Sequence, residues 1–343
     1  MAGFHDALVR KDAPSLHERF FDRFVFNLHP PAGAGTDPSI LFGFGVHPRK
    51  DVADGFVVVT TGGEQRNVRF STELSATDGR GAGPFSYDVV EPMTAWHVAL
   101  GPNPTNVEFD LVWRASGGAW YDEVNVKQGD VTTAAFDHLF QPGRYEGTLT
   151  LDSAAVAVDG WWGVRDRSRG IRTMSGGQGL HIWYQAEFAD RAVGFLLVEG
   201  RDHSRLLLEG GVMLADGSVD PIVDVGHDLE FDDNLDLVGG RVEVTTASGK
   251  AYTLDADARA GGGYMAGAGY GGHHGKPLGR DHLEHDVYPL DGSVTPKTVD
   301  TALTDRLTAF EWSGQQGIGI FEFALTRSST YAYGPRALGR VHR

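Results

Sequence analysis

The sequence predicts an all-β protein, arranged as a pair of β-barrels or as one large sandwich. Short apolar or alternating runs recur along the chain of 343 residues, and clusters of Gly, Pro, Asp and Asn separate them. Such clusters are typical of the turns between consecutive antiparallel strands. The 47 glycines and the near absence of long helical periods point the same way, since a parallel α/β sheet would need helices between its strands.

One short helix is expected, near the start of the chain. Residues Phe4 to Phe24 carry an amphipathic pattern, and Ser15-Leu-His-Glu resembles a capping box, in which an acid follows a hydroxyl by three residues. The strands expected after it in the first half are Phe24–Leu28, Ile40–Val46, Gly55–Thr61, Asn67–Ser71, Ser86–Glu91, Ala95–Leu100, Asn106–Arg114 and Tyr145–Leu151.

The second half repeats this strand pattern, with Asp216-Gly and Asp291-Gly as turn signals. The glycine-rich stretch Ala260–Gly279 is either a surface loop or a lid at a barrel mouth, since loops on rigid β scaffolds often carry function. The expected strands are Leu180–Glu187, Arg191–Gly200, Ser204–Leu214, Ile222–Glu230, Arg241–Thr246, Ala251–Leu254, Val299–Trp312 and Gly317–Leu325.

The stretch from Trp161 to Arg172 joins the two halves and is the favoured place for function. It packs four arginines, one aspartate and two tryptophans into twelve residues. This mixture predicts a buried polar network, whose charges must be paired to survive away from water. Read as a strand, it places Arg165, Arg167 and Arg169 on one face and Asp166 on the other.

Composition excludes several classes of function. The formal net charge of -16 argues against a nucleic-acid partner, because phosphate binding relies on basic patches. There is no cysteine, so disulfides, thiolate zinc sites and cysteine nucleophiles are excluded. The N-terminus lacks the apolar run of a signal peptide, and no stretch approaches the roughly 18 apolar residues that a membrane span needs. A cytoplasmic location is therefore expected.

The central stretch also carries a resemblance to a known family. Gly163-Val-Arg-Asp-Arg-Ser-Arg-Gly-Ile-Arg resembles the Gly-x-Arg-Asp-His-Ser-Trp-Gly-x-Arg signature of a lipocalin-like (calycin) superfamily. This superfamily includes AttH-like proteins, carotenoid 1,2-hydratase (hydroxyneurosporene synthase), tocopherol-cyclase-like proteins and certain Diels–Alderases. Further similar segments begin at Val89, Trp96, Phe109, Phe140 and Phe310, so that the resemblance covers roughly residues 18 to 325.

The resemblance implies two packed lipocalin-like barrels, over residues 1–160 and 161–343, with a ligand cavity in or between them. In hydratase and cyclase relatives the cavity protonates or folds a greasy substrate without a metal or organic cofactor. Two positions depart from the signature, because Arg167 stands where the family has His and Arg169 where it has Trp. Arginine stays protonated and cannot replace a histidine acid or base, which weakens the case for terpene-type hydration or cyclisation.

Three residues are candidates for proton transfer. Asp166 keeps its position in the signature, and neighbouring arginines would hold it ionised as a base or orienting group, or else it locks a structural salt bridge. His274 could supply the acid or base that the signature has lost, with a plain loop histidine as the alternative. Glu322 lies in the closing strand pair and is either a cavity acid or a partner of the arginines.

The arginines allow two interpretations. Arg165, Arg167 and Arg169 form either a paired ladder, with Glu146, Glu187 or Glu322 as partners, or an anion site that binds the carboxylate or phenolate of an apolar ligand. The aromatic side chains are either ordinary barrel core or a lining that stacks on a flat ligand. The candidate lining residues are Trp162, Trp183, Tyr184 and Trp312, and Trp96, Trp113 and Trp161 are further candidates for the same lining.

No metal or other cofactor is expected. The histidines at 273, 274, 282 and 285 and the acids at 281, 284 and 286 match no standard zinc spacing. The favoured function is a cofactor-independent hydratase, cyclase or isomerase that acts on a hydrophobic isoprenoid, polycyclic or aromatic molecule. The alternative is a non-catalytic carrier for a hydrophobic acid, and homodimerisation through barrel edges is a further expectation.

Overall fold

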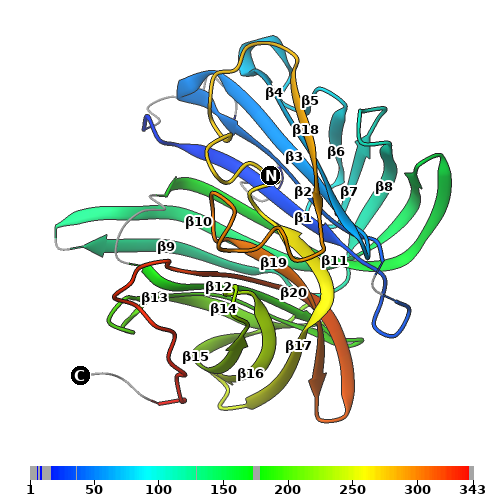
Figure 1. Ribbon diagram of the computed structural model, residues 1–343. Coiled ribbons are helices and arrows are strands. Elements are labelled where there is room, and N and C mark those ends of the chain that lie inside the picture. Colours follow the sequence, from blue (N-terminus) through cyan, green and yellow to red (C-terminus); the bar gives the residue numbers. More distant parts are fainter. Residues whose placement is uncertain are drawn as a thin grey trace.

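The computed structural model describes residues 6, 8–9, 17–35, 37–128, 130–172 and 178–339. Strands dominate these residues, which confirms the all-β prediction, and two short 3₁₀ turns, Pro48–Lys50 and Leu74–Ala76, interrupt them. Within the described ranges there is no helix long and apolar enough to cross a membrane. The strands form two bodies, a curled open sheet and a closed barrel (Figure 1).

The first body is a sheet of 12 antiparallel strands in the order β18-β4-β3-β2-β1-β11-β10-β8-β7-β6-β5, with β9 paired to β10. Its two edges approach each other, because Gly83 between β5 and β6 lies against Phe70 of β4. The strands are β1 (Phe21–Leu28), β2 (Ser39–His47), β3 (Val52–Thr60), β4 (Glu64–Glu73), β5 (Gly81–Ala82), β6 (Phe85–Glu91), β7 (Ala95–Leu100), β8 (Val107–Ala115), β9 (Trp120–Gln128), β10 (Val131–Leu151), β11 (Ala154–Arg172) and β18 (His282–Pro289).

The second body is a closed antiparallel barrel of the remaining strands, β12-β13-β14-β15-β16-β17-β19-β20. Closure removes free strand edges, which would otherwise invite pairing with other chains. The strands are β12 (Gln178–Glu187), β13 (Arg191–Gly200), β14 (Arg205–Leu214), β15 (Val219–Phe231), β16 (Leu237–Thr246), β17 (Ala251–Tyr264), β19 (Thr304–Trp312) and β20 (Gln315–Leu325).

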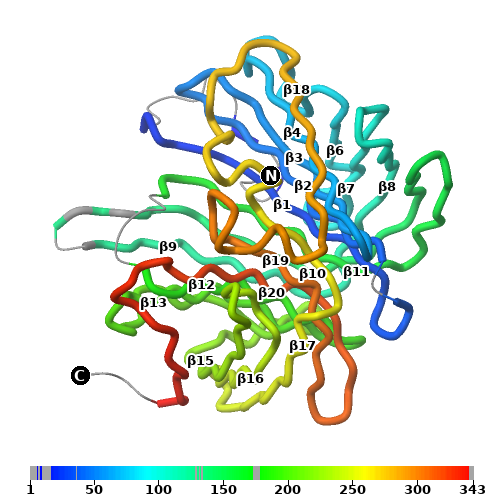
Figure 2. The backbone as a smooth tube through the Cα atoms, viewed as in Figure 1, coloured from blue at the N-terminus to red at the C-terminus, as the bar shows by residue number. Residues whose placement is uncertain are grey.

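The chain passes from the first sheet to the barrel later than the sequence suggests. All of β11 belongs to the first sheet, so the expected division after residue 160 falls inside this strand, and the barrel begins at β12. After β17 the chain returns to the first sheet to add β18 along β4, before it closes the barrel with β19 and β20. Figure 2 shows β18, in orange, beside the blue strands of the first half. The division into two barrel domains, 1–160 and 161–343, stays a prediction.

The expected helix over Phe4–Phe24 is wrong at its C-terminal end, where Phe21–Leu28 forms β1. Phe24 and Phe26 alternate with half-buried positions and point into the core, which is the period of two of a strand. In so short an apolar run, the sequence alone does not distinguish this period from that of a helix. Residues 1–5, 7 and 10–16 of the expected helix lie outside the described residues.

Aromatic side chains fill the inside of each body. In the first sheet the packed rings include Phe24, Phe26, Phe42, Trp96 and Trp113, all fully buried. In the barrel, stacked and tilted rings such as Tyr184, Phe195 and Phe321 take the same place. Two smaller apolar clusters lie between the bodies, and they bring the outer face of the first sheet against the outer face of the barrel.

Candidate functional site

A cavity lies between the two bodies rather than inside either barrel-like core. It holds about 550 Å³ of space free of atoms, a figure that includes its opening to solvent. The first sheet contributes Arg23, Val25, Leu41, His138, Asp166, Ser168 and Arg172; the barrel contributes His181, Trp183, Leu196, Asp305 and Glu322; the segments next to β17 and β19 contribute Met265, Tyr270 and Leu303.

Alternation along β11 and β12 decides which side chains reach this cavity. On β11, Arg165 and Arg167 point into the core of the first sheet, whereas Asp166 points outward to the cavity. On β12, Tyr184 points into the barrel, and Trp183 points outward to the cavity. The site is therefore built from the outer faces of two sheets whose inner faces are filled with aromatic core.

One wall holds a histidine between two carboxylates. The Nε2 atom of His138 lies 2.7 Å from Asp166 Oδ2, and its Nδ1 atom lies 2.6 Å from Glu209 Oε1. Burial opposes a charge on this imidazole, but the negative charges of Glu209 and Asp166 outweigh it and raise the pKa of His138 to about 10. His138 is therefore a cation at neutral pH, and it holds Asp166 in an ion pair at the cavity surface.

The opposite wall holds a second cluster of acids. Asp305 and Glu322 are register partners on β19 and β20, and His181 Nε2 lies 2.9 Å from Glu322 Oε1. Burial and the negative charge of Glu322 raise the pKa of Asp305 well above its ordinary value. Asp305 therefore keeps its proton under conditions in which an exposed aspartic acid has lost it.

These two clusters give the cavity both partners of acid–base chemistry. On the barrel wall, burial and Glu322 raise the pKa of Asp305, and on the wall of the first sheet Asp166 is ion-paired with His138. Pairs of titratable groups whose environments push their protonation states apart are the usual arrangement for a general acid and a general base. The cavity can therefore donate a proton to one end of a bound molecule and accept one from another.

Two further cations lie in the cavity. Within the described part of the chain, the side chains of Arg23 and Arg172 make no ion pair or hydrogen bond with other residues. The guanidinium of Arg23 lies 5.0 Å from the ring centre of Tyr270, and that of Arg172 lies 5.0 Å from the ring centre of Phe136. Burial and the positive charge of Arg23 lower the pKa of Arg172. Two like charges placed together over aromatic rings suit an anionic group.

Residues 39–270 match the family described as a domain of unknown function, DUF7064. The chain belongs to the DUF7064 family. No curated protein matches it significantly. Its fold is similar to the crystal structure of an AttH-like protein from Nitrosomonas europaea, with a TM-score of 0.60 and 12% sequence identity over 92% of this chain and 99% of that chain. This similarity confirms the predicted lipocalin-like fold.

Two other solved structures align more loosely with this DUF7064 protein. CghA in complex with Sch210972 has a TM-score of 0.49 and 12% identity, over 94% of each chain. Kievitone hydratase from Nectria haematococca has a TM-score of 0.46 and 9% identity, over 93% of each chain.

Three of the site residues predicted from the sequence of the DUF7064 protein lie together in the structure. Asp166, Glu322 and Trp183 all line the cavity. His274 does not line it, because its Nδ1 atom faces the buried Asp54 at 3.5 Å, behind the ring of Tyr270. The expected role of His274 in proton transfer stays a prediction.

The three nominated arginines do not line this cavity, because β11 turns their face away from it. The buried Arg167 binds Asp22 of β1, Arg169 pairs with Asp137 of β10, and the guanidinium of Arg165 lies over the rings of Trp96 and Trp113. The paired-ladder interpretation describes them, but the partners are not the expected ones. Of the expected acids, Glu187 binds Arg144, Glu322 lies beside His181, and Glu146 is exposed.

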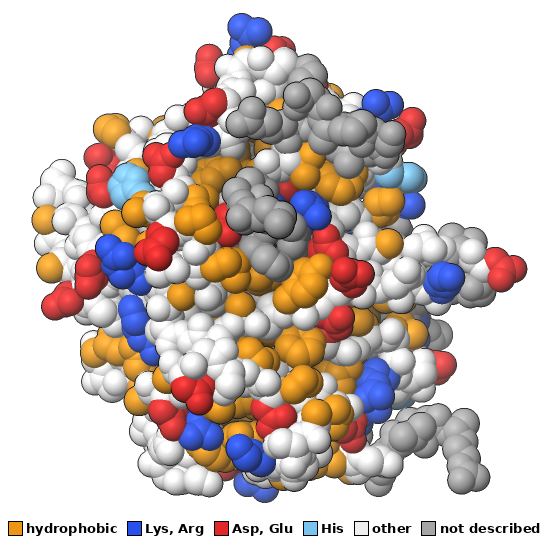
Figure 3. Space-filling model, turned by 180° about the vertical axis from the view of Figure 1, so that it is seen from behind, with side chains coloured by type: hydrophobic (Ala, Val, Ile, Leu, Met, Phe, Trp, Pro, Cys, Tyr) orange, Lys and Arg blue, Asp and Glu red, His pale blue; other side chains and the backbone are white. Residues whose placement is uncertain are grey.

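The other nominated aromatic residues lie elsewhere. Tyr184 is part of the barrel core, Trp162 covers the guanidinium of Arg144, and Trp312 packs on Tyr252 and Arg191 at one end of the barrel. On the face seen in Figure 3, acidic and basic side chains are interspersed, and the described residues there show no large basic patch.

Sequence reasoning missed His138, His181 and Asp305. His138 lies between Phe136 and Phe140 on one strand face, and His181 lies in the apolar start of β12, whereas Asp305 is flanked by Thr304 and Arg306 at the start of β19. A polar residue at an apolar position of a predicted strand is the signal that could have found the two histidines, since a buried titratable group needs a partner or a function.

The raised pKa of His138 predicts how stability depends on pH. A group whose folded-state pKa exceeds its unfolded value stabilises fully below the unfolded value, and the contribution disappears as pH rises through the folded pKa, here from about 6.5 to about 10. Urea unfolding of His138→Gln should therefore show the largest deficit against the wild type near pH 6. The deficit should shrink toward pH 10; an equal deficit at both ends would contradict the assignment.

Proposed function

We propose that this protein is a cofactor-independent enzyme of the hydratase, cyclase or isomerase kind, acting on a hydrophobic isoprenoid, polycyclic or aromatic molecule between the two sheets. The observation that supports this proposal is that Asp305, whose pKa is raised by burial and by Glu322, lies on one wall of the cavity and the ion-paired Asp166 lies on the other. Apolar and aromatic side chains, including Trp183, Leu196 and Tyr270, supply a water-poor environment in which these few charges act strongly.

In the proposed reaction, Asp305 donates its proton to a double bond or carbonyl group of the substrate. Asp166 removes a proton from another position of the substrate, or from a water molecule that attacks it, so no net oxidation or reduction occurs. The negative charge that proton donation leaves on Asp305 lies beside its register partner Glu322, and the imidazole of His181, which contacts Glu322, is the group on that wall that can offset it. The proton returns from Asp166 to Asp305 through solvent after product leaves.

The arginine pair supports a narrower substrate class, a hydrophobic molecule with one anionic end such as a carboxylate or phenolate. Arg23 and Arg172 would orient that end, while the aromatic rings under their guanidinium groups would pack on its apolar part. The same observation favours the second candidate function, a carrier for a hydrophobic acid. The two candidates differ in turnover, because a carrier would leave the ligand unchanged.

Native mass spectrometry of freshly purified protein, followed by identification of any molecule released on denaturation, tests the proposal first. We expect a hydrophobic acid, which is then assayed for turnover with the wild type and with Asp166→Asn. Conversion by the wild type alone supports the enzyme, whereas a released acid that neither protein converts supports the carrier. A neutral hydrophobic ligand would contradict the anionic substrate class and the carrier, and a purely polar ligand would contradict the enzyme proposal as well.

A binding measurement tests the role of the arginines directly. The Arg172→Met variant should bind a naphthalene carboxylate about 10- to 100-fold more weakly than the wild type, because it loses a charge-assisted contact. Binding of the matching methyl ester should change little. Arg169→Met is the control, since Arg169 lies on the same strand but pairs with Asp137. Equal weakening for the acid and the ester would show that Arg172 acts through packing rather than charge.

A further inference from the structure

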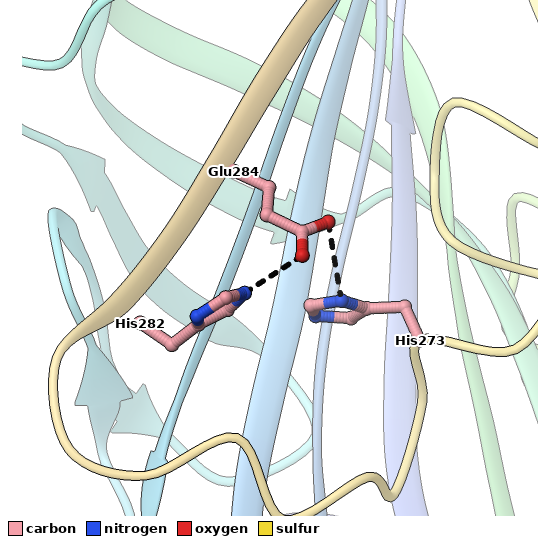
Figure 4. A group of neighbouring side chains, drawn as sticks. All are labelled: His273, His282 and Glu284. Carbon is pink, nitrogen blue, oxygen red and sulfur yellow. Dashed lines mark hydrogen bonds and ion pairs between the residues drawn. The ribbon is translucent and has the colours of Figure 1, made fainter.

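Outside the cavity, a loop and an edge strand bring two histidines and a glutamate together. His282 and Glu284 lie on β18, and His273 lies in the segment that connects β17 to β18. Figure 4 shows the three side chains pointing toward one another. One nitrogen or oxygen atom from each lies within 4.8 Å of the other two. The segments meet because β18 pairs with β4, although the sequence spacing of these residues matches no standard pattern.

The alternation of side chains along β18 places His282 and Glu284 on one face and His285 on the other. His282 and Glu284 are two residues apart on β18 and therefore share a face, with 2.8 Å between His282 Nε2 and Glu284 Oε1. His285 points to the opposite, exposed face of the same strand. On the loop side, His273 Nδ1 lies 3.9 Å from Glu284 Oε2.

His273 gives a second, independent indication of a ligand. Its residue surface is only 8% exposed, and its Nε2 atom has no hydrogen-bond partner among the described residues. A buried imidazole nitrogen without a partner carries a desolvation cost that a ligand at this position would offset.

A neighbouring cation does not prevent metal binding here. Arg69 touches Glu284 only through Nε at 3.3 Å. Its other nitrogens bind Asp286 at 3.1 and 3.3 Å and the carbonyl oxygen of Gly267 at 2.8 Å. Glu284 can therefore turn toward a metal ion while Arg69 remains paired.

We propose that His273, His282 and Glu284 bind a divalent transition-metal ion of the zinc type, with water in the remaining position. Two imidazoles and a carboxylate are a ligand set that zinc takes in tetrahedral sites, at bond lengths of about 2 Å. Only small side-chain movements would bring the three ligand atoms to such distances. None of these residues lines the cavity, so the ion would lie outside the proposed proton-transfer site.

Metal binding here would fasten the segment after β17 to the first sheet. That segment also carries Met265 and Tyr270, which line the cavity. The ion would therefore stabilise one side of the proposed binding site without taking part in proton transfer. A metal that binds the folded state alone raises the stability of that state in proportion to the logarithm of its concentration.

Calorimetric titration of the full-length, chelator-treated protein with Zn²⁺ tests this proposal. We expect one equivalent to bind and Tm to rise. His282→Ala should weaken zinc binding at least tenfold, and its half-exposed position makes it tolerant of replacement. His285→Ala is the matched control on the same strand and should bind zinc as the wild type does. Absence of saturable binding, or equal binding by His282→Ala and the wild type, would overturn the site.

The outcome is separable from the proposed function. Asp166→Asn and Asp305→Asn should bind zinc with wild-type affinity, because neither residue approaches the proposed metal ligands. Substitution with Co²⁺ gives a second readout that needs no activity. A visible spectrum typical of tetrahedral cobalt in the wild type, lost in Glu284→Gln, supports the ligand set, whereas a spectrum unchanged in Glu284→Gln counts against it.

Discussion

Replacement of Arg167 by Met should lower the free energy of unfolding by about 3–5 kcal/mol, the usual cost of removing one partner from a buried ion pair. Both Arg167 and Asp22 have fully buried side chains, and three of their hydrogen bonds measure between 2.8 and 3.0 Å. Without the guanidinium, Asp22 keeps its buried position with only the amide of Val9 as a described donor. Chemical unfolding at pH 7 measures the loss.

Arg169→Met provides the control for this experiment. Arg169 lies two residues further along β11, and its side chain is 29% exposed in an ion pair with Asp137. Exposed and half-exposed pairs contribute roughly 0–1 kcal/mol, so this variant should stay within that range. Similar losses in both variants would show that charge number, rather than burial of the Arg167–Asp22 pair, determines the stability of the strand.

Replacement of Asp305 by Asn should lower kcat by about 10²- to 10⁴-fold on the substrate that native mass spectrometry identifies, since general acid catalysis contributes about that much. Asparagine has the shape of the protonated aspartic acid but has no proton to give. Asp166→Asn should produce a loss of the same order, because it removes the carboxylate on the facing wall. Asp255→Asn, which changes an exposed pair with Arg241 on the barrel surface, is the control.

Stability separates a catalytic role of Asp305 from a structural one. The folded-state pKa of Asp305 is raised, so its contribution to stability is present at low pH and is lost as pH rises through the folded value. Asparagine has no such loss, and Asp305→Asn should be at least as stable as the wild type above neutral pH. A variant that is both stable and fully active would remove Asp305 from the mechanism.

Much of the fold was open to sequence analysis because each strand carries its own pattern. The apolar and alternating runs between turn signals predicted sixteen strands, and each of these segments overlaps a strand of the structure. Twelve lie wholly within a strand. Three extend one residue beyond it, and Val299–Trp312 begins five residues before β19. The strands that the sequence did not predict are polar or irregular. β18 carries charged residues on an edge, where no apolar face needs covering, so its pattern resembles a loop.

For the site, the sequence by itself determined that Asp166 and the arginines at 165, 167 and 169 lie on opposite faces of β11, because alternation is a property of one strand. Only the tertiary structure decided that the aspartate face meets the cavity, while the arginine face closes the core of the first sheet. Packing of the barrel against that outer face brought Glu209, Asp305 and Glu322 to it. Which acids meet which bases depends on strands far apart in the chain, and no local pattern records that pairing.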